Sequence, residues 1–282
     1  MKSYIQSLST SLIVLASLTA LLVAYVSSVL FFPYITGKNF GFRILVELML
    51  LVYIPLAYLA PEYRPKKSKG LLIYGTFVGV LFLADILGVN PSNSLWSNFE
   101  RMEGFVTHIH LFVFTLILVS LRLSQVEWKK LFQFHLLANL LVVSNAFGEI
   151  SKISKALEAG EAPLQRISAT LGNPAYLAIY SAFVIFFALL LLVQAKKHAP
   201  IEKTLYISSI ILNLILIWET QTRGTVLGLL AGFGVGFVWY AWKKRDNKKL
   251  RNIAIAGVAL FFVVIGSFLS FKESNFVQGS PT

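Results

Sequence analysis

Long apolar runs recur along the whole chain, and only short polar connections separate them. A helix needs about 20 mainly apolar residues to cross about 30 Å of hydrocarbon. Nine runs of suitable length can be placed, at residues 11–32, 42–60, 70–88, 105–121, 131–147, 176–194, 204–218, 225–242 and 253–271. They predict an all-α polytopic integral membrane protein, with residues 1–282 forming one transmembrane domain.

The composition agrees with this fold class. Hydrophobic residues make up 56% of the chain and charged residues only 13%, too few to cover the surface of a soluble domain. The net charge of +12 lies in short clusters beside the apolar runs, so membrane topology accounts for it better than nucleic-acid binding. Cysteine is absent and no cluster of histidines and carboxylates is visible, so we expect no metal and no other cofactor.

The distribution of lysine and arginine predicts the orientation. Counted over alternate connections, 17 of the 25 basic residues fall on one side, and positively charged loops favour the cytoplasm. We therefore expect a cytoplasmic N-terminus and, with nine spans, a C-terminus outside. The first run is longer than the apolar region of a signal peptide and is predicted to stay as an anchor.

The predicted outer side is enriched in arginine. Four of its 8 basic residues are arginines, namely Arg43, Arg101, Arg166 and Arg223, against four of the 17 inner ones. A guanidinium can bind phosphate oxygens through two parallel hydrogen bonds, whereas lysine is a hydrated point charge. The pattern indicates an anionic ligand at the outer leaflet. The alternative, that these arginines extend to lipid headgroups, stays open.

Arg223 has the strongest case as a ligand for such an anion. It lies in a short polar connection, and Gly224 follows it where the eighth run begins, so free backbone amides and the positive helix end would also attract an anion. Glu219, four positions earlier, would orient or neutralise the guanidinium. Asp85, near the outer end of the third run, could meet any of the arginines. For Arg43 and Glu47, also four apart, an ion pair within one helix is the favoured interpretation.

Other polar residues in the spans have simpler explanations. His108 and His110 are the weak candidates for a general base, and a hydrogen-bonded packing role is favoured for both. Three asparagines within spans are expected to form hydrogen bonds between helices, Asn139, Asn145 and Asn213.

Two further patterns concern local structure. The longest connection, residues 148–175, is rich in lysine, glutamate and alanine over 151–161, where a short surface helix is expected. In the eighth run Gly228, Gly232 and Gly236 recur every four residues, which favours close packing of a neighbouring helix.

Three outer segments resemble motifs of one family. Thr220-Gln-Thr-Arg-Gly-Thr-Val-Leu-Gly228 resembles the Ser/Thr-Arg-Gly signature of the O-antigen ligase and O-antigen polymerase superfamily of membrane glycosyltransferases. Arg166-Ile-Ser-Ala-Thr-Leu-Gly-Asn-Pro-Ala-Tyr-Leu-Ala178 is similar to its stretch in which an arginine precedes a Thr-Leu/Phe-Gly-Asn-Pro turn. Arg101-Met-Glu-Gly104, after Ser94-Leu-Trp-Ser97, resembles members less specifically. The motif-bearing region is centred on residues 166–242.

This resemblance implies a reaction in the bacterial cytoplasmic membrane. A glycan on a polyprenyl diphosphate donor would pass to an acceptor hydroxyl of a lipid, a glycan or a protein, outside the membrane. Arg166 and Arg223, with Arg101, would bind the diphosphate, and Glu219, Gly224 and Asp85 would support them. The family's catalytic histidine lies in a large outer loop that this chain does not contain, so we expect a truncated chain, ending in residues 272–282, with no catalytic base of its own.

Several functions stay open at this point. An O-antigen-type polymerase would use the same donor as a ligase and lengthen glycan repeats. A transporter or flippase of an anionic lipid-linked substrate is a different class, although the charges lie at the outer ends of the spans and not at the midplane. A further alternative is a non-catalytic subunit that presents the lipid-linked sugar to a partner enzyme.

Overall fold

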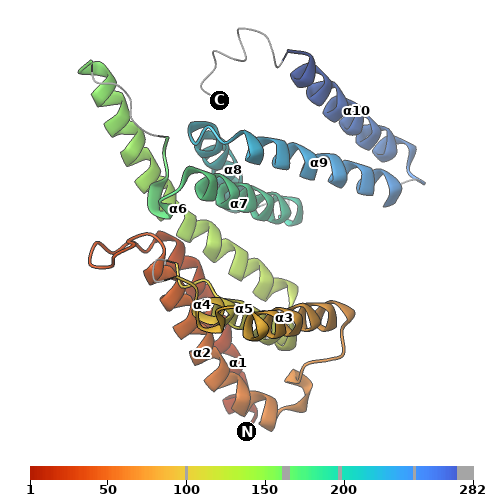
Figure 1. Ribbon diagram of the computed structural model, residues 1–282. Coiled ribbons are helices and arrows are strands. Elements are labelled where there is room, and N and C mark those ends of the chain that lie inside the picture. Colours follow the sequence, from red (N-terminus) through yellow and green to blue (C-terminus); the bar gives the residue numbers. More distant parts are fainter. Residues whose placement is uncertain (99–100, 161–165, 196–198, 244–245, 272–282) are drawn as a thin grey trace.

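The computed structural model describes residues 1–98, 101–160, 166–195, 199–243 and 246–271. Every regular element among these residues is a helix (Figure 1). The elements are α1 (Lys2–Leu18), η1 (Thr19–Ala24), α2 (Thr36–Leu59), η2 (Pro61–Tyr63), α3 (Lys69–Leu87), α4 (Pro91–Trp96), α5 (Phe105–Leu121), α6 (Gln125–Glu158), η3 (Ala169–Leu171), α7 (Pro174–Gln194), α8 (Pro200–Glu219), α9 (Arg223–Lys243) and α10 (Lys248–Phe271). The predicted end of the chain, residues 272–282, lies outside the described part.

Each of the nine predicted runs overlaps a helix. Within the described residues, seven helices are long and apolar enough to cross a membrane, namely α1 with η1, α2, α3, α6, α7, α8 and α9. α5 matches the fourth run but is shorter, at 17 residues, and α10 covers the ninth. The described part of the chain is therefore all-helical, with seven long apolar candidate spans.

The first helix differs from its predicted position. It runs continuously over Lys2–Ala24 and not over residues 11–32. The chain leaves the helix at Tyr25, whose ψ of 127° is extended. Packing explains the shift, because Leu12 and Ala16 are fully buried and the earlier Ile5 and Leu8 pack against the same core cluster. The polar N-terminal segment is drawn into the helix by these apolar neighbours.

The predicted surface helix over residues 151–161 is not a separate element. α6 is one helix of 34 residues that continues through Gly148 and ends at Glu158. A capping box starts it: Ser124 Oγ accepts from Glu127 N, and the Glu127 carboxylate accepts from Ser124 N at 2.7 Å. Good helix formers after the apolar run extend the helix beyond its buried part.

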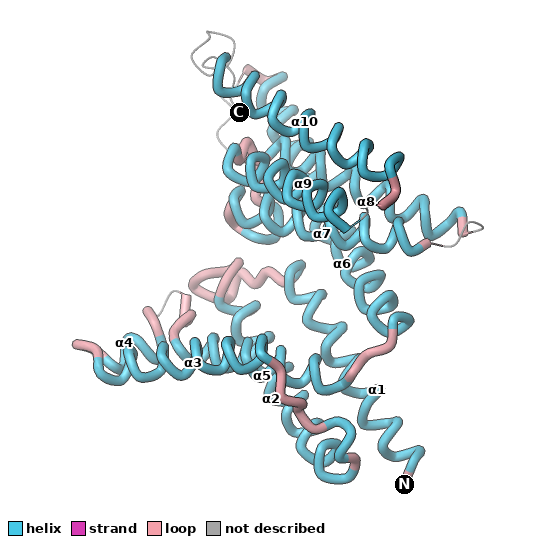
Figure 2. The backbone as a smooth tube through the Cα atoms, turned by 90° about the vertical axis from the view of Figure 1, so that its right-hand side faces the viewer, coloured by secondary structure: helices cyan, strands magenta, loops and turns pink. Residues whose placement is uncertain are grey.

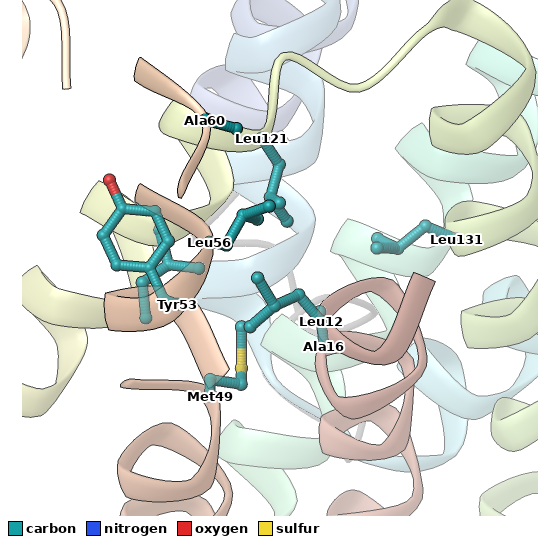
Figure 3. Packing of buried hydrophobic residues seen from close by; sticks show 9 residues of the cluster. Leu12, Ala16, Met49, Tyr53, Leu56, Ala60, Leu121 and Leu131 are labelled. Atoms are coloured by element: carbon teal, nitrogen blue, oxygen red, sulfur yellow. The ribbon is translucent and has the colours of Figure 1, made fainter. Parts of the chain in front are cut away.

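α6 connects two groups of helices. Figure 2 shows α1–α5 on one side of the molecule and α7–α10 on the other. Residues of α6 contribute to all three buried clusters: Leu131 packs with α1, α2 and α5, and Leu136 and Val142 pack with α7 and α8. Figure 3 shows the first cluster, in which Leu12, Met49, Leu56 and Leu121 meet.

Apolar side chains also cover much of the exterior. α3 has a single buried residue, Val78, whereas Leu72 and Ile73 are 71% and 70% exposed. Exposed apolar patches of this extent mark contact with a membrane or a partner. Together with the seven candidate spans, they indicate a multi-pass membrane protein.

Alternate helix ends lie on the same side of the molecule. The loop over residues 25–35 and the end of α6 lie at the left of Figure 1, and the α2–α3 connection lies at the right. We call the first side the arginine end, because it carries Arg43, Arg101, Arg166 and Arg223, and the second the lysine end, because it carries Lys66, Lys67, Lys69, Lys129 and Lys243.

A buried pair of amides joins α6 to α8. Asn213 Nδ2 donates to Asn139 Oδ1 at 2.9 Å, and Asn139 Nδ2 donates back at 3.3 Å. This confirms the predicted interhelical hydrogen bond for these two residues, whereas Asn145 is exposed.

Asn139→Leu and Asn213→Leu should each lower the free energy of unfolding by about 1 kcal/mol, and the double variant by less than the sum. Thermal unfolding in detergent measures this, with Asn145→Leu as the matched control. Additive losses would contradict the pairing.

Candidate functional site

Arg166 joins the two strongest sequence motifs. Its Nε donates to Thr220 O at 2.7 Å and its Nη2 to Thr222 Oγ1 at 2.9 Å, across 54 and 56 residues of chain. The guanidinium thus holds the α8–α9 turn from the side of the α6–α7 connection. The two motif segments, far apart in sequence, are therefore hydrogen-bonded to each other.

The α8–α9 turn presents Arg223 at the start of α9. Gln221 has a positive φ of 50°, which reverses the chain, and Thr222 O accepts from Thr225 N at 3.1 Å. Thr220 is fully buried and anchors the turn through Ile217 O at 2.7 Å. Arg223 is exposed, and its side chain has no hydrogen bond or ion pair with the described residues. Arg223 thus has no partner among the described residues, and it directly follows the turn that Arg166 holds in place.

The predicted supporting residues have different positions. Gly224 lines a cavity next to Arg223, with open space where a Cβ would be. Glu219 ends α8, and Asp85 lies in the last turn of α3. Neither carboxylate forms an ion pair within the described part of the chain, and so neither neutralises Arg223 there.

Three helices fix the connection that carries Arg166. Glu149 Oε2 of α6 accepts from Ser168 N at 2.8 Å and from Ala169 N at 3.0 Å. Lys38 Nζ of α2 donates to Thr170 O, and Thr170 Oγ1 donates to Val23 O at 2.9 Å. Ala169 has a positive φ of 47°, a strained conformation for alanine that these bonds maintain. The position of Arg166 is therefore set by side chains from distant parts of the sequence.

The Gly172-Asn-Pro turn then opens α7, as its motif predicts. Gly172 has φ 67°, and a Cβ there would lie 2.4 Å from Tyr34 Cγ, so only glycine fits both the backbone and the packing. Asn173 Oδ1 accepts from Ala175 N at 2.8 Å, and Pro174 occupies the first turn of α7.

Arg101 belongs to a different set of contacts. Its carbonyl and that of Met102 accept from Asn39 Nδ2, both at 3.0 Å, while its side chain is exposed. Arg43 is buried and donates to Met102 O and, at 2.6 Å, to Thr107 Oγ1. These bonds tie the segment before α5 to α2. Between described residues, no hydrogen bond or ion pair joins Arg101 to Arg166 or Arg223.

The expected ion pair of Arg43 with Glu47 is replaced by other partners. Glu47 Oε1 lies 3.2 Å from His110 Nε2, and His110 Nδ1 lies 2.6 Å from Val106 O. Arg43 can reach the α4–α5 loop because α5 packs against α2, a contact that helix periodicity alone does not reveal. Both ring nitrogens of His110 are engaged, which fits the packing role expected for it.

Two cavities open at the arginine end. One, of about 480 Å³, lies between α2, α5 and the start of α7 and includes Lys38, Glu103, His108, Leu171 and Tyr176. His108 makes no hydrogen bond with the described residues, so its ring is free to face a ligand. The other, of about 440 Å³, lies between α7 and α9.

The second cavity is mostly apolar and starts at the α8–α9 turn. It includes Thr222, Gly224 and Gly228 together with Phe183 and Phe186. Of the glycines predicted to pack closely, only Gly232 meets a neighbour, Phe186 Cζ at 3.1 Å, while a Cβ at Gly228 or Gly236 would meet open space. Among the described residues, the predicted close packing is therefore found at Gly232 and not at Gly228 or Gly236.

Glu149, Lys38 and Thr222 were not identified from the sequence as site residues. Glu149 and Lys38 are single polar residues with no motif around them, whereas Thr222 lies in the Thr-Arg-Gly motif without an assigned role, and each acquires its role only when the helices pack. In the described residues, no group of three or more histidines and carboxylates could hold a metal ion.

Comparisons with known proteins add no relationship. No protein-family model, no curated protein and no solved structure matches this chain.

Proposed function

We propose that this chain is the membrane part of a glycosyltransferase of the O-antigen ligase type, in a bacterial cytoplasmic membrane. It would transfer a glycan from a polyprenyl diphosphate donor to a hydroxyl of a lipid, glycan or protein acceptor outside. The observation that carries the proposal is the pair of hydrogen bonds from Arg166 to the turn that presents Arg223. The guanidinium of one motif is thereby tied to the turn that directly precedes the arginine of the other.

A diphosphate leaving group explains why two arginines would be needed. The transfer breaks the bond between the sugar C1 and the diphosphate oxygen and forms a bond from C1 to the acceptor oxygen, while the proton of the acceptor hydroxyl passes to solvent. Negative charge then develops on the departing diphosphate, and fixed cations stabilise it most when they are positioned in advance. Arg166 is positioned by Thr220 and Thr222, and Arg223 is free to bind the ligand.

The apolar groove between α7 and α9 suits the rest of such a donor. It begins at Thr222 and Gly224, beside the arginines, and continues along Phe183 and Phe186. An anionic head at the turn would place a polyprenyl tail in this groove. Few soluble anions would need both an arginine pair and an apolar channel.

The acceptor would enter from the neighbouring cavity that includes His108. Leu171 in its wall belongs to the same connection that carries Arg166, and Tyr176 lies in the first turn of α7, which follows that connection. The charge distribution favours an orientation with the arginine end outside. A polymerase of glycan repeats would share the donor site and differ in the acceptor.

Binding of polyprenyl diphosphate to the purified protein in nanodiscs tests the proposal. The wild type should bind the diphosphate more tightly than the polyprenyl monophosphate. Arg223→Ala should weaken diphosphate binding about tenfold or more, because a hydrogen bond to a charged group is lost. Arg223→Lys should recover only part of the affinity, since lysine lacks the planar fork.

Lys152→Ala is the matched control. Lys152 is exposed on α6 towards the same end, so its loss changes the net charge equally without touching the turn. Unchanged diphosphate affinity in Arg223→Ala, or an equal loss in Lys152→Ala, would reject the site.

A further inference from the structure

The lysine end carries a further cavity, which the proposed function does not use. It measures about 810 Å³ and lies where α3 begins beside α5. Its polar part is formed by Lys66, Lys67, Ser68 and Lys69, and its apolar part by Leu71, Leu72, Gly75 and Phe112, with Thr76. A cluster of cations therefore stands at the mouth of an apolar groove.

The cations of this cluster are not used by the fold. Arg64, just before them, donates from Nε to Ala57 O at 2.9 Å, and Tyr53 OH donates to Tyr63 O at 2.9 Å, so the start of the α2–α3 connection is fastened to α2. The three lysines are exposed and form no ion pair with the described residues. Their charges remain available to a ligand.

The groove itself opens to the side of the helix bundle. Tyr74 and Phe112 pack edge to face, with ring centroids 5.4 Å apart, and hold α3 against α5. Leu72, in the same groove, is 71% exposed, and α3 has only one buried residue. In a membrane this surface faces lipid, so the occupant of the groove must itself be amphipathic.

We propose that this groove binds an anionic phospholipid, with its phosphate among Lys66, Lys67 and Lys69 and an acyl chain along Gly75 and Phe112. Clusters of basic residues directly beside a membrane-spanning helix attract anionic lipids. The charge complementarity selects the headgroup, and the apolar floor selects a lipid over a soluble phosphate. The inference is independent of glycan transfer.

Native mass spectrometry of the purified protein tests this, with phosphatidylglycerol and phosphatidylcholine added in detergent. The wild type should retain phosphatidylglycerol preferentially. The triple variant Lys66→Gln, Lys67→Gln, Lys69→Gln should lose about tenfold or more in phosphatidylglycerol affinity. Its matched control, Lys130→Gln, Lys248→Gln, Lys249→Gln, removes the same charge from the same end and should change little. Equal losses in both would show diffuse attraction and overturn the proposal.

A variant that leaves every charge in place tests the groove. A Cβ at Gly75 would lie 3.4 Å from the Phe112 ring, so Gly75→Leu should fill the cavity and reduce lipid retention, whereas Gly79→Leu, one turn on in open space, should not. Full retention in Gly75→Leu would overturn the acyl-chain site. Displacement of the lipid by excess inorganic phosphate would show a phosphate site and equally contradict a lipid.

Discussion

Replacing Gly172 by alanine should lower the free energy of unfolding by about 2–5 kcal/mol and remove diphosphate binding. The φ of 67° costs a residue with a Cβ about 1–2 kcal/mol. The new Cβ would also lie 2.4 to 2.7 Å from three atoms of Tyr34, and overpacking of this kind costs about 1–3 kcal/mol. Because Arg166 lies on the same short connection, the shift would displace it from Thr220 and Thr222. Thermal unfolding and nanodisc binding measure the two effects.

Gly160→Ala separates backbone strain from the clash. Gly160 also has a positive φ, of 78°, but a Cβ there would meet nothing within 4 Å. We expect this control to show only the backbone cost and to keep normal ligand binding. Tyr34→Gly removes all three clashing atoms, so the double variant with Gly172→Ala should lose less stability than the two single losses combined. Equal destabilisation by Gly172→Ala and Gly160→Ala would show that contact with Tyr34 has no role.

The helices were predictable because the bilayer imposes a length on them. Every predicted run overlaps a helix, whereas the boundaries of the first helix and of α6 were not predictable from apolar length alone. Helix α1 begins early because Ile5 and Leu8 join the core, and α6 continues because its charged extension still favours a helix. Side-chain packing and local helix propensity determine these helix ends outside the apolar runs, where hydropathy does not indicate them.

The arginine site was predictable only in part. Arg166 and Arg223 stand in motifs, so their involvement could be predicted. The hydrogen bonds from Arg166 to Thr220 and Thr222 could not, because they depend on how α7 and α8 pack. Glu149 gave no signal because an isolated carboxylate at the end of an apolar run has the same appearance as a solvated one. The prediction for Arg43 was wrong for a related reason. Its four-residue spacing suggested an ion pair with Glu47, whereas helix packing gives it hydrogen bonds to Met102 O and Thr107 Oγ1.

Arg166→Ala should weaken polyprenyl diphosphate binding about a hundredfold, a larger loss than that of Arg223→Ala. It removes one cation and also frees the turn that positions the other, and hydrogen bonds of a charged donor are worth about 1.5–3 kcal/mol each. Arg166→Lys should recover little, because one ammonium cannot reach Thr220 O and Thr222 Oγ1 with the geometry of Nε and Nη2. Thr222→Val keeps both cations and breaks a single bond, so we expect an intermediate loss.

A double-mutant cycle shows whether the two arginines form one site. If Arg166 positions Arg223, the double variant should bind only slightly more weakly than Arg166→Ala alone, because the second cation is already displaced. Independent headgroup contacts would instead give additive losses, and Thr222→Val would then have no effect. Lys155→Ala, an exposed charge on the last turns of α6, controls for net charge. Additivity in this cycle would leave two separate lipid-facing arginines and remove the reason to place a diphosphate between them.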